Sequence, residues 1–451
     1  MSDWATDAVF YHLFPLGCLG APEHNSFDGP PVDRISGLMR WIDIVEDLGA
    51  TAVLLGPVFQ SSKHGYDVSD YFQVDRRLGD DAGFSRVCRE MHRRGIRIVL
   101  DAVFHHTGRE FWAFCDVRKK GRASRYCDWY HLDFSRRSAY GEPFHYQGWA
   151  GHYDLVKLNL ANPEVRGHLF AAIASWVERF EIDGLRLDAA DALAPEFVDQ
   201  LSGYCRNLKS DLWLMGEVVH GDYRRWVHPG GLASTTNYQA YKGLWSSLND
   251  RNYFEIAYSL NHQFGREGMY AGLPLYSFVD NHDVDRIASK LKQPAHLYPL
   301  YALLLTMPGV PSIYYGSECG IEGRKIRGTD APLRPALDPE VLLAAAPHPE
   351  LRAAIKKLIG LRGRHLVLRR GDYSQLHVAA EQFAFIRRDA NESIVVAVNA
   401  SDRCVEVPLR NTDIGGSQLF DLLNDGENFN LASPKGMLPL HPRWARILAV
   451  G

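Results

Sequence analysis

The amino-acid sequence predicts a (β/α)8 barrel, the TIM-barrel architecture, with an insertion after the third strand and a C-terminal antiparallel β-sandwich domain. Eight short apolar runs alternate with amphipathic helical patterns, which is typical of a parallel sheet covered by helices. The intervals between the runs fit one or two strand–helix units, and four of the runs end in an acidic residue. Barrels of this kind carry their chemistry at the carboxyl ends of the strands.

Each predicted barrel strand is one of the apolar runs. In chain order they are AVFYHLF (8–14), TAVLL (51–55), IRIVLD (96–101), GLRLD (184–188), LWLMGE (212–217), the weaker LASTTNY (232–238), LYSFVDNHD (275–283) and VPSIYYG (310–316). Two of the intervening helices are expected at 83–95 and 162–182. The second opens with Asn162 as N-cap and Pro163 in the first turn.

Two parts of the chain do not fit the barrel. Residues 107–157 lack strong periodicity and are rich in aromatic residues, so we expect an inserted domain that walls one side of the cleft and buries most of these rings in a small core. From residue 368, strand-like alternation continues without helices. We therefore predict barrel segments at 1–106 and 158–367, an inserted domain at 107–157 and a C-terminal β domain at 368–451.

The composition narrows the function classes. The 451 residues include 50 basic and 54 acidic side chains, which leaves no basic face of the kind that nucleic-acid binding requires. The seven cysteines form no C-x-x-C pair, so we expect neither a disulfide framework nor a zinc site. The N-terminal segment lacks the basic start and the cleavage site of a signal peptide, so we expect cytoplasmic residence.

One uncharged stretch, residues 297–316, has the length of a membrane span. Pro308, Gly309 and Pro311 interrupt it. We therefore expect a buried helix followed by a buried strand, and no membrane contact.

The acidic residues at the strand ends need a reason, because buried carboxylates cost free energy unless they are paired or have a chemical role. Asp188 lies two residues after Arg186, so both side chains project from the same face of the fourth strand. Retaining glycoside hydrolysis uses one carboxylate that attacks the sugar and one carboxylic acid that protonates the leaving oxygen. Its oxocarbenium-like transition state is also stabilised by a third negative charge.

Six sequence segments occur together in one order. Four are DAVFHH (101–106), GLRLDAAD (184–191), GEVV (216–219) and FVDNHD (278–283), and two more are HGYDVSDYFQVD (64–75) and GVPSIYYGSECG (309–320). In this order and spacing they resemble the characteristic regions of glycoside hydrolase family 13, the α-amylase family. The resemblance extends from about Val9 into the C-terminal β domain, which is nearly the whole chain.

The resemblance implies a role for each of these residues. Asp188 would be the nucleophile, Glu217 the general acid/base and Asp283 the stabiliser of the transition state. Arg186 would keep Asp188 ionised, and Asp101 would orient Arg186. The other substrate-binding candidates are Tyr66, Asp67, His106, His282, Asp330 and Arg334, the last two in the motif DAPLR after the eighth strand.

The resemblance also indicates a subgroup. LVKLN (155–159) is similar to the MPKLN signature of the neopullulanase and cyclomaltodextrinase group, which acts on α-1,4 and α-1,6 links in short or cyclic maltodextrins. Asp191 and Ala192 stand where typical α-amylases have Lys and His, which is not the pattern of a starch endo-amylase. We expect Asp191 at an exposed position in the cleft.

Neither a metal ion nor a cofactor is expected. His105 stands where many family members have an Asn that binds calcium, so the resemblance does not extend to that site. His105 and His106 are adjacent, and adjacent side chains on a strand point to opposite faces, so we do not expect them to share a metal.

Three functions stay open at this point. The first is a hydrolase of short or cyclic maltooligosaccharides, with cyclic α-maltosyl-(1→6)-maltose as one candidate substrate. The second is a glucanotransferase or a trehalose-synthase-type isomerase, which shares the covalent intermediate but excludes water. The third is a non-catalytic transporter subunit or binding module, which the full set of carboxylates disfavours.

The expected partner is a small oligosaccharide. Members of the subgroup usually form dimers through an N-terminal β domain, whereas the first predicted strand here starts near residue 8. A homodimer would therefore use another surface.

Overall fold

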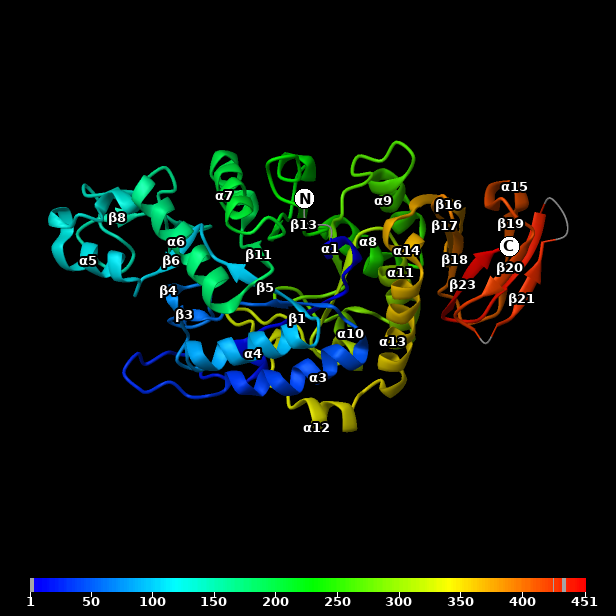
Figure 1. Ribbon diagram of the computed structural model, residues 1–451, viewed down its shortest axis with the longest axis horizontal. Helices are drawn as coiled ribbons and strands as arrows, with labels where there is room; N and C mark the ends of the chain where they lie inside the picture. The colour runs from blue at the N-terminus through cyan, green and yellow to red at the C-terminus, as the bar shows by residue number, and fades with distance from the viewer. Residues whose placement is uncertain (1–3, 425, 432–434) are drawn as a thin grey trace.

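The computed structural model describes residues 4–424, 426–431 and 435–451, and its centre is a barrel of eight parallel strands (Figure 1). In chain order these are β1 (Phe10–Leu13), β2 (Ala52–Leu55), β5 (Arg97–Ala102), β11 (Gly184–Leu187), β12 (Trp213–Gly216), β13 (Ser234–Thr235), β14 (Tyr276–Phe278) and β15 (Val310–Tyr314). A bridge between Thr236 and Tyr276 closes the ring between β13 and β14. Every predicted run contains one strand, so the (β/α)8 prediction is confirmed.

Helices cover the outside of the barrel (Figure 1). The longer ones are α3 (Leu38–Leu48), α4 (Asp81–Arg93), α6 (Pro163–Phe180), α7 (Pro195–Leu208), α8 (Tyr238–Asn249), α9 (Phe254–Phe264), α11 (Leu297–Thr306) and α13 (Pro349–Arg364). α6 begins as predicted, because the Asn162 side chain accepts a hydrogen bond from the backbone N–H of Glu164 and Pro163 occupies the first turn. Glu181 ends the helix with a left-handed φ of 54°, which turns the chain toward β11.

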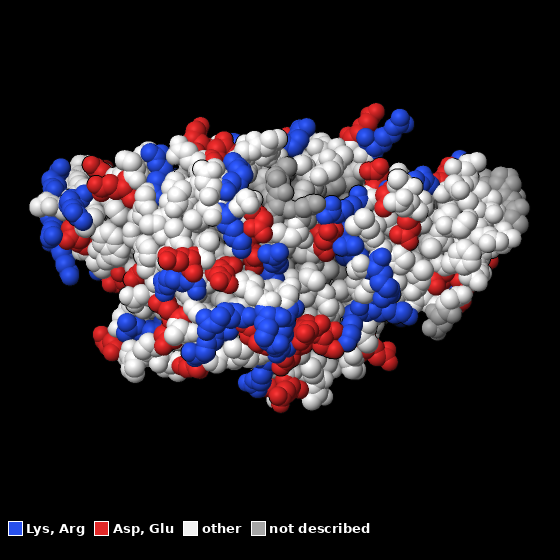
Figure 2. Space-filling model, viewed as in Figure 1, with Lys and Arg blue, Asp and Glu red and all other residues white. Residues whose placement is uncertain are grey.

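Charged side chains on the outer helices are paired across the helices. Arg94, directly after α4, contacts Asp43 and Glu46 on α3 at 2.6 and 2.8 Å, and Glu90 on α4 at 2.7 Å. On the face shown in Figure 2, basic and acidic side chains lie side by side over α3 and α4. Exposed pairs of this kind contribute little to stability. Among the described residues of this face, the alternation of basic and acidic side chains leaves no extended patch of a single charge over α3 and α4.

The segment between β5 and α6 forms a small unit at one end of the molecule (Figure 1). Its elements are β6 (His106–Gly108), α5 (Trp112–Lys120), β7 (Leu132–Asp133), β8 (His145–Tyr146), β9 (Gly148–Trp149) and β10 (His152–Lys157). Phe114, Phe144 and Tyr146 are fully buried and contact one another, with the Phe114 and Tyr146 ring centroids 5.0 Å apart. The expected aromatic core is therefore present, although Trp112 is 39% exposed.

An antiparallel β domain occupies the opposite end of the molecule (Figure 1). One sheet has the order β16 (Asp372–Val378), β17 (Gln382–Arg388), β18 (Ser393–Asn399), β23 (Trp444–Val450), β20 (Gln418–Asp421) and β21 (Asn428–Asn430), and β19 (Val405–Arg410) pairs with β22 (Lys435–Leu440). Along β17, Phe383 and Phe385 belong to the core shared with the barrel, whereas Ala384 and Ile386 belong to a second core under β19 and β22. The predicted C-terminal antiparallel domain is confirmed.

The uncharged stretch 297–316 divides into α11 and β15. Gly309 lies between them with a φ of 111°, a conformation that favours glycine. The side chains of both elements are buried, except for the half-buried Tyr298 of α11. This arrangement is the expected buried helix followed by a buried strand, and no helix among the described residues combines the length and apolarity that a bilayer crossing requires.

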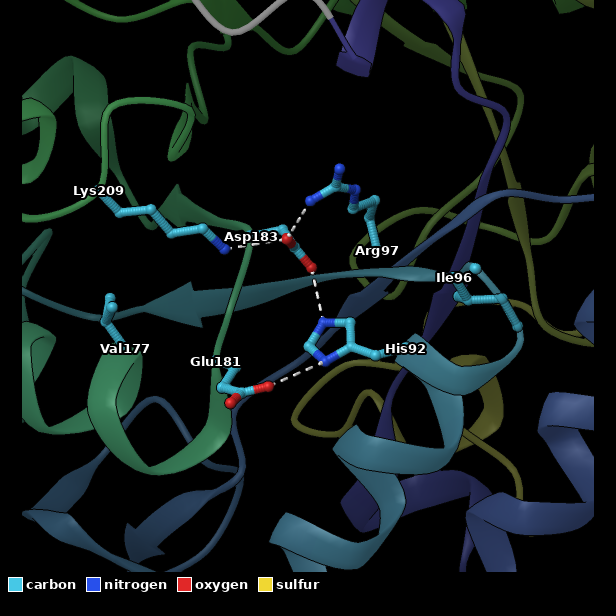
Figure 3. A pocket seen from close by; sticks show the side chains of 8 residues that line it. His92, Ile96, Arg97, Val177, Glu181, Asp183 and Lys209 are labelled. Carbon is cyan, nitrogen blue, oxygen red and sulfur yellow. Dashed lines mark hydrogen bonds and ion pairs between the residues drawn. The ribbon is translucent and has the colours of Figure 1, made fainter.

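A buried acidic residue ties together the N-terminal face of the barrel (Figure 3). Asp183, directly before β11, is 2% exposed and lines a cavity of about 640 Å³. Its carboxylate lies 2.9 Å from His92 Nε2 and accepts hydrogen bonds from Arg97 Nη1 at 2.7 Å, Lys209 Nζ at 3.0 Å and the backbone N–H of Ile98 at 2.9 Å. Burial alone would raise the pKa of Asp183, but these partners hold it well below its ordinary value.

We expect Asp183→Asn to lower the free energy of unfolding by about 2–3 kcal/mol, because Arg97 and Lys209 lose their buried charged partner. Urea denaturation at pH 7 measures this change. Since folding lowers the pKa of Asp183, its contribution is complete above the ordinary aspartate pKa of about 3.9 and is lost as the pH falls below that value. The difference between wild type and variant should therefore shrink in acid.

The matched control for this prediction is Asp211→Asn. The Asp211 side chain is 47% exposed and lies 3.7 Å from Arg97. We expect a change below about 0.5 kcal/mol for an exposed pair of this kind. Equal destabilisation by the two variants would contradict a special role for Asp183.

Candidate active site

The predicted acidic residues lie at the carboxyl ends of four barrel strands. Asp101 is the last but one residue of β5, Asp188 follows β11 directly and Glu217 follows β12 directly. Asp283 lies five residues beyond the end of β14. Because the strands are parallel, their carboxyl ends share one mouth of the barrel.

The guanidinium of Arg186 is shared by three of these carboxylates. Arg186 is 3% exposed, and its Nη1 lies 2.6 and 2.8 Å from the two carboxylate oxygens of Asp101 and 3.3 Å from Oδ1 of Asp188. Its Nη2 lies 2.8 Å from Oε2 of Glu217. Arginine keeps its charge when buried and offers several donors in one plane, so a single side chain fixes all three carboxyl groups.

Asp188 lies in an environment that opposes its ionisation. Burial, followed by the negative charges of Glu217 and Asp101, raises the pKa of Asp188 well above its ordinary value, and the Arg186 charge only partly compensates. Three carboxyl groups around one guanidinium therefore favour the retention of a proton within the cluster. Retention of one proton among several carboxyl groups is what a site with one carboxylate and one carboxylic acid requires.

Asp283 has partners of its own. Its carboxylate lies 2.9 Å from Arg334 Nη2 and 3.0 Å from His282 Nε2, and the same Arg334 nitrogen lies 3.1 Å from Asp330. Although burial alone would raise the pKa of Asp283, His282 and Arg334 hold it far below its ordinary value. Asp283 is therefore ionised, and the predicted residues Asp330 and Arg334 do lie at this site.

Aromatic rings pack beside these charged side chains. The rings of Tyr66 and His282 are stacked, with centroids 5.5 Å apart and an angle of 12° between their planes. The Tyr66 hydroxyl donates to Asp101 Oδ2 at 2.8 Å and also contacts His282 Nε2. Phe14 stacks on the His282 ring at 5.5 Å and lies under the Arg334 guanidinium at 4.5 Å. Phe14 ends the first predicted run, but no sequence motif marks it as a site residue.

His106 and Asp67 differ in how their polar atoms are used. His106 Nε2 is buried and has no hydrogen-bond partner among the described residues, and burial lowers the pKa of His106 to about 3, so the ring is neutral. Asp67 Oδ1 accepts from the backbone N–H groups of His64 and Gly65, at 3.1 and 3.2 Å. Asp67 therefore shapes the loop that carries Tyr66, and its hydrogen bonds do not reach the carboxylate cluster.

Two further expectations concern residues near the mouth. The Nδ1 atoms of His105 and His106 lie 3.3 Å apart, so the expectation that the two rings point apart is wrong, because His105 precedes β6 and strand alternation does not apply to it. Within the described residues, no group of three or more His, Cys, Asp or Glu side chains is arranged to hold a metal ion. Asp191 is exposed, as expected.

Sequence comparison finds a related family and related enzymes. A family model described as "Alpha amylase, catalytic domain" matches residues 26–337. The chain is 32% identical to a cyclomaltodextrinase of Geobacillus thermopakistaniensis over 448 residues, which cover 95% of this chain and 74% of that protein. It is 31% identical to Neopullulanase 2 of Thermoactinomyces vulgaris, over 99% of this chain and 78% of that protein.

Solved structures agree with these matches. The ligand-free cyclic α-maltosyl-(1→6)-maltose hydrolase from Arthrobacter globiformis has a TM-score of 0.84 and 26% identity, with 100% of both chains covered. A debranching enzyme from Nostoc punctiforme also has a TM-score of 0.84 and 26% identity, with 100% of this chain and 99% of that chain covered. The chain belongs to the α-amylase family of glycoside hydrolases and is similar to its cyclomaltodextrinases and neopullulanases.

Proposed function

We propose that this α-glucan hydrolase cleaves α-1,4 and also α-1,6 glucosidic bonds in short or cyclic maltooligosaccharides, with retention of anomeric configuration. The observation that carries the proposal is the sharing of one buried guanidinium by Asp188 and Glu217. A retaining glycosidase needs two carboxyl groups beside the same sugar carbon, one ionised and one protonated. Burial and the neighbouring carboxylates raise the pKa of Asp188, which supports the retention of one proton within this cluster, and the proposed mechanism places that proton on Glu217.

In the first step, an Asp188 oxygen attacks the anomeric carbon of the sugar. The bond from that carbon to the glycosidic oxygen breaks, and Glu217 gives its proton to the departing oxygen. In the second step, Glu217 takes a proton from water, the water oxygen bonds to the anomeric carbon, and Asp188 leaves as a carboxylate. Two inversions restore the original configuration.

The other residues of the site would act on the sugar or on the carboxylates. Asp283, held ionised by Arg334 and His282, would stabilise the positive charge of the transition state. The free Nε2 of His106 offers a hydrogen bond to a sugar hydroxyl, and the Tyr66 ring offers a flat apolar surface for the sugar ring. We assign Arg186 to holding Asp188 and Glu217, and Asp67 to shaping the loop that carries Tyr66.

The substrate class rests on the relatives and on one sequence difference. The similar proteins are named as a cyclomaltodextrinase, a neopullulanase and a cyclic maltosyl-maltose hydrolase, whose names refer to cyclic or short glucans or to pullulan. Asp191 and Ala192 replace the Lys and His of typical α-amylases, which argues against starch as the main substrate. A relative named "Intracellular maltogenic amylase" supports a cytoplasmic location.

The same proposal includes a division of the chain into barrel segments 1–106 and 158–367, an inserted domain 107–157 and a β domain 368–451. The inserted elements from β6 to β10 pair with one another. The C-terminal strands have a second core of their own. Both observations support these boundaries.

We expect the wild type to hydrolyse some members of a panel of maltotriose, β-cyclodextrin, pullulan, panose and cyclic maltosyl-maltose, while soluble starch and trehalose stay nearly intact. Chromatography resolves the products, and NMR of the first products should show the α-anomer. Glu217→Gln should lose at least ~100-fold of this activity, because it cannot donate the proton. Glu196→Gln, the same change at an exposed position on α7, should keep wild-type activity.

Other results of the panel would select another function. Longer or isomerised products with a constant number of reducing ends would indicate a glucanotransferase or a trehalose-synthase-type isomerase. A wild type that binds these sugars without cleaving them would contradict the hydrolase proposal.

We expect Arg186→Lys to lower kcat/KM by at least ~100-fold, because one ammonium group cannot hold three carboxyl groups in a fixed plane. The measurement is kcat/KM on the best glucan of the panel, with the thermal midpoint recorded to confirm folding. Arg94→Lys, at the residue directly after α4 and outside the active site, is the matched control, with unchanged activity expected. Activity of Arg186→Lys within threefold of wild type would exclude this role for Arg186.

A further inference from the structure

The side chain of Glu217 has a third partner, which lies outside the six sequence segments quoted above. Tyr238, the first residue of α8, donates its hydroxyl proton to Oε1 of Glu217 at 3.2 Å. The other carboxyl oxygen, Oε2, lies 2.8 Å from Arg186 and accepts from the backbone N–H of Ala189 at 3.3 Å. Tyr238 therefore contacts the carboxyl oxygen that Arg186 leaves free.

The direction of the Tyr238 proton follows from Asn281. Oδ1 of Asn281 accepts from the backbone N–H groups of Asp283 and Val284, at 2.8 and 3.2 Å. The amide nitrogen of Asn281 must then face the other way, and it donates to the Tyr238 oxygen at 3.3 Å. A phenol oxygen that accepts from an amide has its single proton left for Glu217.

We propose that Tyr238, oriented by Asn281, is a positioning residue for the proton transfer of Glu217. A carboxyl oxygen has two lone-pair directions. Tyr238 occupies one of them at Oε1 and leaves the other for the proton that Glu217 transfers to and from the substrate. This inference rests on the proposed role of Glu217 as general acid/base. It adds the hydrogen bond from Tyr238 as the contact that fixes the plane of the Glu217 carboxyl group.

Ring packing holds the Tyr238 side chain in place independently of its hydroxyl group. It packs edge-on against Phe278 with centroids 5.1 Å apart, and against Tyr241 with centroids 6.0 Å apart. Tyr238→Phe keeps this packing and removes the two hydrogen bonds of the hydroxyl, the one donated to Glu217 and the one accepted from Asn281. The variant therefore tests positioning rather than packing.

Tyr241 provides a matched control on the same helix. Its ring stacks on Phe278 at 5.3 Å, and its buried hydroxyl has no hydrogen-bond partner among the described residues. Tyr241→Phe thus removes a hydroxyl from the same aromatic cluster without touching Glu217. We expect no change in activity from it.

The experiment compares two substrates that differ in their need for an acid. The first is the glucan of the panel that the wild type cleaves fastest, whose leaving oxygen must be protonated, and the second is α-maltosyl fluoride, whose fluoride leaves without a proton. For Tyr238→Phe we expect kcat/KM on the glucan to fall by about 10-fold or more, mainly through kcat. On α-maltosyl fluoride, kcat/KM should stay within about threefold of wild type.

Glu217→Ala is the reference for complete loss of the acid. In its background, Tyr238→Phe should have no further effect on glucan cleavage, because no carboxyl group remains to be positioned. This double variant keeps the test valid even if Tyr238→Phe lowers the thermal midpoint.

The outcomes separate this inference from the proposed function. If Glu217→Ala cleaves the glucan as well as wild type does, the proposed role of Glu217 fails. The other case is that Glu217→Ala loses activity on the glucan and keeps activity on α-maltosyl fluoride, as the role of an acid requires. In that case the inference about Tyr238 alone is overturned by any of three results for Tyr238→Phe: unchanged kcat/KM on the glucan, an equal fall in kcat/KM on both substrates, or a full further fall in the Glu217→Ala background.

Discussion

The buried charge of Arg186 is the constraint on which the rest of the site depends. A guanidinium that is 3% exposed cannot lose its proton at ordinary pH, and carboxylates here compensate its buried charge. The register of the barrel does this, because Arg186 on β11 is directly beside Asp101 on β5, and Glu217 immediately follows β12 on the other side. Three adjacent strands therefore set the geometry, and loops are not needed to bring these groups together.

The remaining charges of the mouth form a second, separate group around Asp283. The two groups differ in their charge balance. Three carboxyl groups share Arg186, whereas Asp283 contacts both His282 and Arg334, the latter shared with Asp330. Burial acts on both, yet the pKa of Asp188 is raised and that of Asp283 is lowered. One barrel mouth can thus retain a proton among the carboxyl groups around Arg186 while Asp283 stays ionised at the same pH.

The parts that the sequence predicted are those with a local signal. Apolar runs located all eight strands, and four of these runs end in acids. Even the two-residue β13 was located, because Ser234 and Thr235 lie at the spacing that a barrel requires. Tyr238 and Phe14 were missed because their roles come from contacts with residues far along the chain, which no periodicity records. The rings of His105 and His106 lie closer together than strand alternation predicts, because β6 begins only at His106 and His105 lies before it.

The unpaired polar atoms of the mouth connect stability with recognition. His12 Nε2, His106 Nε2 and His282 Nδ1 are buried and have no hydrogen-bond partner among the described residues, and each such atom costs about 1–3 kcal/mol. Burial lowers the pKa of both His12 and His106, so these rings are neutral and each has one donor and one acceptor nitrogen. A sugar hydroxyl also donates and accepts. A hydroxyl-rich ligand that reaches such an atom removes this cost, whereas an apolar ligand of the same shape leaves it, and this difference favours carbohydrate over other ligands that fit the cleft.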